Sequence, residues 1–292
     1  MAKLISIGQI IDDTWENYTN NFKTWMAVSS LLFIISAVWI LGSILSPGAN
    51  TNFLIEQGLI SPLQTFGLSL SAVASKILFP LVTFWLTIIF IKVIAELNNK
   101  KKINLKEILL FGVKKIMPTI AVFFLQTLIA ASSRLAIVPG FVLTLINANI
   151  NGGAVLGYFA LFLTFVGEIV ALGLLIFLAV TFAFSAYELL IGEKTIIESL
   201  KGSYTLVKGR FFEVILRYIA PKILITSVII FLNLALTFIL VLLFGRVLET
   251  QYFLQELSSI LTNLSFSAVM VLTAPLWVIA DYSVYDSLRK TK

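Results

Sequence analysis

TIIESLKGSYTLVKGRFFEVILR, residues 195–217, is a basic amphipathic segment that leads into a long apolar run. Apolar residues recur in its first half at helical spacing, and the charged residues fall largely outside that stripe. The apolar positions are Ile196, Ile197, Leu200, Tyr204 and Val207, and the charged positions are Glu198, Lys201 and Lys208. A helix of this kind lies flat at a membrane surface, with its lysines toward anionic headgroups. The pattern therefore predicts a surface helix between two membrane spans.

The composition of the whole chain indicates an integral membrane protein. Hydrophobic residues make up 59% of the 292 residues and charged residues only 12%, with a mean hydropathy of +1.00. A soluble globular domain is about 45–50% apolar and about 25% charged. The chain contains no Cys and no His, which removes thiol chemistry, disulfides and imidazole ligands. These absences favour a protein that is not an enzyme and that holds no metal or cofactor.

Long apolar runs predict an all-α polytopic protein with six transmembrane helices in a single membrane domain, residues 1–292. The predicted spans are residues 25–45, 75–97, 118–146, 154–187, 218–244 and 260–280, and the predicted amphipathic interfacial helices are residues 5–22, 103–115 and 195–209. Six spans place both termini on one side of the membrane. That side would carry 17 of the 21 Lys and Arg residues, whereas the opposite loops would carry Lys76 and Arg246. The asymmetry predicts cytoplasmic termini.

Each third of the chain reads as a surface helix, a span, an outer loop and a second span. Gln9, Glu107 and Glu198 hold similar positions in the three surface helices. One interpretation is a threefold repeat of a helix hairpin. The other is that any protein with six spans gives hairpins joined by cytoplasmic loops.

Arg134 and Glu168 are the only charged residues deep within the spans of the central hairpin. Both lie roughly 25 Å from the turn near Ile150 at about 1.5 Å per residue, so antiparallel helices would bring them level. Burial of either charge alone is costly, which predicts an intramembrane ion pair. The pair could fix the register of the hairpin, or it could belong to a proton or ion path.

Two further features within the spans could serve a transport site. Pro139 and Gly140 predict a kink or a break in the third span, and broken helices line transporter sites. Polar side chains at bundle depth could hydrogen-bond between helices or converge on a cavity. They are Gln126, Ser132, Ser133, Asn147, Asn233 and Asn263.

The net charge of +6 arises from basic residues that lie beside apolar spans. This placement favours membrane lipids as partners over nucleic acid, with another membrane or cytoplasmic protein as a further candidate. The predicted anionic-lipid surface consists of Lys100, Lys101, Lys102, Lys201, Lys208 and Arg210.

Two stretches carry a resemblance to a known family. They are SIGQIIDDTWENYTNNFKTW near the start and FAFSAYELLIGEKTIIESLKGSYTLVKGRFF at the centre, with Ser199-Leu200, Ser203, Leu206 and Gly209-Arg210 as the matching positions. The chain resembles uncharacterised bacterial six-span membrane proteins that are similar to the membrane domain fused ahead of glycerophosphoryl diester phosphodiesterases. Because no phosphodiesterase domain follows Lys292, that activity is not expected here. The resemblance implies a protein of the bacterial inner membrane without an assigned reaction.

Three classes of function follow from these features. A non-enzymatic module that organises lipid or a partner protein accounts for the surface helices and the lack of reactive residues. A transporter or channel for a small solute would use the Arg134–Glu168 pair. An intramembrane enzyme acting on lipids lacks His, Cys and a convergent pair of Asp residues. A continuous polar cavity would favour transport, and a dry bundle with a basic surface would favour the module.

Overall fold

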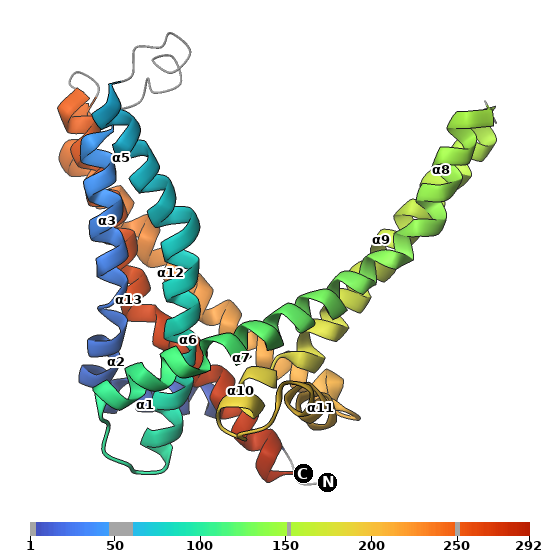
Figure 1. The fold of residues 1–292 in the computed structure, drawn as a ribbon, viewed down its shortest axis with the longest axis horizontal. Coiled ribbons are helices and arrows are strands. Elements are labelled where there is room, and N and C mark those ends of the chain that lie inside the picture. The colour runs from blue at the N-terminus through green and yellow to red at the C-terminus, as the bar shows by residue number, and fades with distance from the viewer. Residues whose placement is uncertain (1–3, 47–60, 151–152, 249–251) are drawn as a thin grey trace. The chain divides into compact units, whose positions relative to one another are not determined.

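The computed structural model describes residues 4–46, 61–150, 153–248 and 252–292 (Figure 1). All regular secondary structure within these ranges is helical, which confirms the predicted all-α class. Six helical stretches of the described chain are long and apolar enough to cross a membrane. They are Phe22–Leu45, Pro62–Asn98, Leu105–Ile150, Gly153–Leu190, Phe211–Leu243 and Ile260–Lys290, and each overlaps one predicted span.

The described residues form two compact units. The central unit comprises Leu4, residues 114–216 and residues 285–292, and the flanking unit comprises residues 5–113 and 217–284. The single membrane domain predicted for residues 1–292 therefore stays a prediction.

Helices from both ends of the chain build the flanking unit. It contains α1 (Ile7–Asn20), α2 (Phe22–Ser29), α3 (Leu32–Leu45), α5 (Pro62–Val73), α6 (Phe79–Asn98) and most of α12 (Phe211–Leu248) and α13 (Tyr252–Lys290). Helices α3 and α5 run side by side (Figure 1). A Cβ atom on Gly42 would lie 2.9 Å from the carbonyl oxygen of Gly67, so these glycines permit close contact of the two backbones.

The second span begins earlier than the sequence pattern predicts. Helix α5 starts at Pro62, with a capping box between Ser61 and Gln64. A π-helical turn, Ala74–Leu78, then joins α5 to α6 without a break in the helical path. Residues 47–60, between the first two predicted spans, lie outside the described residues. The predicted start at residue 75 thus falls on the π-helical turn, inside one long stretch.

The central unit contains a long helical hairpin followed by two short helices. Its elements are α7 (Leu105–Ala131, from residue 114 on), a 3₁₀ segment (Ser132–Ile137), α8 (Val138–Ile150), α9 (Gly153–Phe182), α10 (Ser185–Leu190) and α11 (Ile196–Val207). Helix α8 packs along α9 (Figure 1). Gly167 of α9 permits close contact with the 3₁₀ segment, because a Cβ atom there would lie 2.6 Å from the carbonyl oxygen of Ala136.

Two predicted helix boundaries are corrected by the course of α7 and α8. The surface helix predicted at residues 103–115 and the span predicted from residue 118 form one continuous helix that passes through Pro118. A proline inside a helix removes only one backbone hydrogen bond, and neighbouring groups can compensate in a membrane. The interruption comes instead at the 3₁₀ segment, directly before Pro139 in the first turn of α8. Gly140 packs against Thr164 of α9.

The residues singled out for a repeat share one structural role. Gln9, Glu107 and Glu198 are each the third residue of a helix, and each side chain bonds to the residue before that helix. The partners are Ser6, Asn104 and Thr195. The capping box at the start of α5 has the same arrangement, so capping alone does not distinguish the surface helices from a membrane span. The threefold repeat stays a prediction.

Candidate functional site

The chain interrupts its helical path between α9 and α10, and a serine of α11 supports this break. Ser203 Oγ donates a hydrogen bond to the carbonyl oxygen of Thr181 at 2.7 Å and accepts one from the amide of Phe184 at 3.2 Å. Ser203 is fully buried. Groups at a helix end have no partner within the helix, and unpaired backbone groups are costly to bury. Ser203 therefore holds α11 against the break.

A buried carboxylate lies just beyond the break. Glu188 of α10 is only 4% exposed. Its Oε1 accepts a hydrogen bond from the Tyr285 hydroxyl at 3.0 Å, and its Oε2 forms an ion pair with the Lys194 ammonium. The Lys194 side chain is 41% exposed, so it connects the buried carboxylate to the surface. Both carboxylate oxygens thus have partners, as a buried charge requires.

Gly202 lets α11 approach this carboxylate closely. A Cβ atom at position 202 would lie 2.5 Å from Glu188 Oε2 and 2.9 Å from Lys194 Nζ. On another side of the carboxylate, the rings of Tyr285 and Tyr187 stack with their centroids 5.3 Å apart. We name Glu188, Lys194, Gly202, Ser203 and Tyr285 the α11 anchor.

The two faces of α11 differ from the predicted stripe. The buried residues are Ser199, Leu200, Gly202, Ser203, Leu206 and Val207. Within the predicted apolar stripe, Leu200 and Val207 are buried, whereas Ile197 is 60% exposed and Tyr204 41% exposed. The difference arises because small residues, which carry little hydropathy signal, make the close contact with the rest of the unit.

The exposed face of α11 has the composition of a helix at a membrane surface. It joins the apolar side chains of Ile197 and Tyr204 to the exposed ammonium groups of Lys201 and Lys208. The Lys208 ammonium lies 5.7 Å from the centre of the Tyr204 ring. Apolar groups can enter the headgroup region while lysines meet anionic phosphates.

The remaining basic residues of the predicted lipid surface fall into two groups. Arg210 is partly buried and bonds through Nη1 to Thr291 Oγ1 at 2.7 Å and through Nη2 to Thr291 O at 3.1 Å. It therefore holds the end of the chain beside α11. Lys100, Lys101 and Lys102 are exposed in the turn between α6 and α7, in the flanking unit.

Arg134 and Glu168 are brought together by the hairpin of the central unit. Arg134 Nη1 lies 2.9 Å from Glu168 Oε2. Their side chains remain 65% and 53% exposed, and they line a cavity of about 240 Å³ together with Ala171 and Leu175. Pro139 and Gly140 lie in α8, near the start of that helix.

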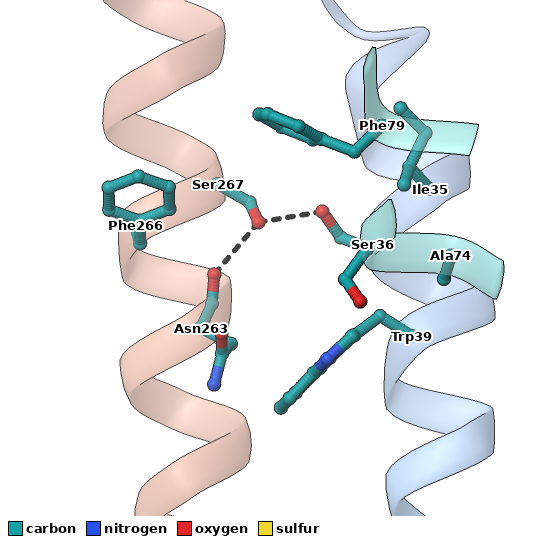
Figure 2. Close-up of a pocket in the computed structure, with 9 residues that line it drawn as sticks. Ile35, Ser36, Trp39, Ala74, Phe79, Asn263, Phe266 and Ser267 are labelled. Carbon is teal, nitrogen blue, oxygen red and sulfur yellow. Dashed lines mark hydrogen bonds between the residues drawn. The ribbon is translucent and has the colours of Figure 1, made fainter. Parts of the chain in front are cut away.

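A second cavity, of about 210 Å³, lies within the flanking unit (Figure 2). Ser36 Oγ of α3 lies 2.6 Å from Ser267 Oγ of α13, and Ser267 donates to the carbonyl oxygen of Asn263 at 2.8 Å. Ala74 and Ser75 of the π-helical turn also line the cavity. Single π-helical turns inside α-helices occur frequently at functional sites.

The polar residues predicted at bundle depth do not share one site. Gln126 donates to the carbonyl oxygen of Phe182 at 2.6 Å and so supports the end of α9, whereas Asn263 lines the cavity of the flanking unit. Ser132 donates to the carbonyl oxygen of Ile129 in the last turn of α7, and Asn233 donates to that of Ile229 within α12. The Ser133 hydroxyl and the Asn147 side-chain oxygen are buried without a hydrogen-bond partner.

Sequence reasoning missed the α11 anchor and one further ion pair. Lys222 Nζ lies 3.0 Å from Asp281 Oδ1 and 3.3 Å from the centre of the Tyr218 ring. A usable signal was present, because Glu188, Lys222 and Asp281 are isolated charges near the ends of apolar spans, and such charges need partners.

Six long apolar helices, with charged networks near their ends, define a polytopic α-helical membrane protein. Comparison of the chain with known protein families, with curated proteins and with solved structures finds no match in any of the three. The resemblance to the membrane domain of phosphodiesterase fusions therefore stays a prediction.

Proposed function

We propose that the protein is a non-enzymatic membrane module that binds anionic lipid headgroups at the exposed face of α11. The two-faced construction of this helix carries the proposal. Its inner face is held by Ser203 and by the charged anchor at Glu188, while its outer face presents Lys201 and Lys208 beside Tyr204. A helix fixed in this way keeps its lysines in one arrangement, so little order has to be gained on binding.

Electrostatic attraction to the membrane surface supports the same proposal. A basic residue near an anionic surface contributes about 1 kcal/mol. Neutralisation of both lysines should therefore weaken binding of an anionic lipid by roughly tenfold to thirtyfold, since about 1.4 kcal/mol corresponds to a factor of ten. The bias of basic residues to one side supports placement in a bacterial inner membrane with both termini cytoplasmic.

Native mass spectrometry can test the proposal on the full chain released from nanodiscs. The nanodiscs contain phosphatidylglycerol and phosphatidylethanolamine in equal amounts. We expect the protein to retain phosphatidylglycerol selectively, and the K201Q/K208Q double variant to lose that selectivity. The K76Q variant is the control, because Lys76 lies in the π-helical turn of the flanking unit and is predicted on the opposite side.

Thermal unfolding of each variant would establish that the fold is retained. Equal retention of phosphatidylglycerol by the double variant and the unaltered protein would exclude α11 as the site. Retention of both lipids in proportion to their abundance would exclude recognition of the headgroup altogether.

Transport of a small solute is the second candidate. The observation that favours it is the cavity of about 240 Å³ beside the exposed Arg134–Glu168 pair. A role in transport requires these charges to contact the solute or a proton during the cycle. Flux through proteoliposomes that is lost in the R134Q/E168Q variant, with folding retained, would favour this function over the module.

A further inference from the structure

We propose that the cavity between α3, the π-helical turn and α13 binds an uncharged amphiphile that carries a hydroxyl group on an alkyl chain. This site lies in the flanking unit and does not depend on the lipid surface at α11. Trp39, Phe79 and Phe266 line the cavity, and Figure 2 shows Trp39 and Phe79 between α3 and α13, with the Phe266 ring beside α13.

The hydrogen bonds at the cavity determine whether its serine hydroxyl groups can donate to a ligand or only accept from it. A serine hydroxyl has one hydrogen to donate and two lone pairs to accept with. The Ser267 hydrogen goes to the carbonyl oxygen of Asn263, so in the Ser36–Ser267 contact Ser36 must be the donor. The Ser75 hydroxyl donates to the carbonyl oxygen of Ser71 at 2.9 Å. The serines therefore face a ligand as acceptors, and the ligand must supply a donor.

The charge of the ligand follows from the lining. None of the described residues that line the cavity is Asp, Glu, Lys or Arg. A cation could bond to the serine oxygens, but it would enter an apolar region without an opposite charge, which is unfavourable. A hydroxyl group carries no charge and has a hydrogen to donate to a serine oxygen. It can also accept a hydrogen bond from a donor such as the Trp39 indole.

The size and walls of the cavity indicate an alkyl chain of moderate length. Its volume of about 210 Å³ exceeds that of an engineered cavity of about 150 Å³ that holds benzene. A chain of about eight to ten carbon and oxygen atoms would fit such a space. Three aromatic side chains and Ile35 offer apolar contact along it. The small side chain of Ala74 leaves this space open.

Photolabelling of the full chain in phosphatidylcholine nanodiscs tests the site directly. The probe is octanol that carries a diazirine on its chain, and labelled residues are mapped by tandem mass spectrometry. We expect saturable labelling at Trp39, Phe79 or Phe266, with protection by excess octanol. Octane and octanoate at equal membrane concentration should protect at least tenfold less well, because one lacks the hydroxyl and the other is charged.

Variants of the lining residues distinguish binding in the cavity from labelling by probe dissolved in the lipid. S36A removes one acceptor and should weaken protection by octanol about threefold to tenfold. S75L enlarges a side chain that lines the cavity and should reduce the labelling, whereas S69L, the same change on α5 at a residue that does not line it, should not. The proposal would be overturned if the unaltered protein is labelled at exposed residues such as Phe124 and Phe162 and octanol gives no protection. This outcome does not depend on whether any variant folds.

Discussion

The hydroxyl oxygen of Tyr285 lies 3.0 Å from Glu188 Oε1, although 97 residues separate the two in the chain. This contact joins the last helix to the short helix that follows the break in α9. Because Lys194 occupies the other carboxylate oxygen, the three side chains form one network. Groups of one buried network contribute to stability as a unit, so their deletions should not add.

Truncation of the network should therefore reveal coupling. We expect E188A to lower the free energy of unfolding by about 1–3 kcal/mol, because it leaves the buried Tyr285 phenol without its acceptor, whereas the partly exposed Lys194 ammonium can bond to water. Y285F should cost about 1–2 kcal/mol, the loss of one hydrogen bond to a charge. Reversible unfolding of the detergent-solubilised protein, followed by circular dichroism, would measure both.

The double variant of these two residues provides the control. Y285F should add little to the cost of E188A, since its acceptor is already gone. Strictly additive effects would mean that the phenol and the carboxylate do not interact in solution.

Replacement of Gly202 by a larger residue should lower the stability of the central unit. G202A would place a methyl group 2.5 Å from Glu188 Oε2, and we expect a loss of about 1–3 kcal/mol in the free energy of unfolding. G173A is the matched control, because position 173 is also helical and a Cβ atom there meets nothing within 4 Å. The control should be neutral or stabilise by about 0.5–1 kcal/mol. Equal effects of the two changes would contradict the close contact of α11.

The sequence predicted well what depends on distance along the chain. Hydropathy identifies six spans because each is a continuous run, and the rise per residue places Arg134 level with Glu168 across one turn. The α11 anchor was not predicted, because the register between α10 and α13 depends on three-dimensional packing. Gly202 was not identified, and Ser203 was identified only as a position of the family resemblance, since small residues give no hydropathy signal even where they allow the closest contacts.

The cavity of the flanking unit could not be predicted from the sequence either. Ser36 and Ser267 are 231 residues apart, and no periodicity relates them. The π-helical turn beside them has no sequence signature comparable to a proline or glycine break. Asn263 was predicted as a polar residue at bundle depth, but its neighbours could not be inferred from one helix.

Exchange of the two charges in the central hairpin would distinguish a structural role of the pair from a transport role. R134E or E168R alone replaces this ion pair by two like charges, and an uncompensated charge at the centre of a span costs about 2.5–3.5 kcal/mol. The R134E/E168R exchange should recover most of that loss in an assay of thermal unfolding. Flux in proteoliposomes should not change if the pair only fixes the register. Loss of flux with recovered stability would assign the pair to a transport path.

The N-terminus of α11 should loosen in acid. Hydrogen bonds from the Thr195 side chain and backbone hold the pKa of Glu198 below its usual value. A carboxylate whose pKa is lower in the folded state stabilises that state above its unfolded pKa, near 4.3, and loses this effect as the pH falls through the folded value. Hydrogen exchange of the first turn of α11, corrected for intrinsic rates, should therefore accelerate below about pH 4.3.

The E198Q variant supplies the control for this pH dependence. Its amide can still bond to Thr195 but does not titrate, so the acceleration attributable to position 198 should disappear. Persistence of the same acid response in E198Q would assign it to another group.

Ser203 should matter more than any other serine of α11, because it alone bonds across the break after α9. S203A would leave the carbonyl oxygen of Thr181 and the amide of Phe184 without this partner in a buried place, which costs about 1–3 kcal/mol. Ser199 is the matched control, since it is equally buried on the same helix but donates to Ile196 of its own helix. S199A should therefore change the unfolding midpoint little, while S203A should lower it and increase proteolysis between α9 and α10. If both variants behave alike, the break is supported by packing rather than by the serine.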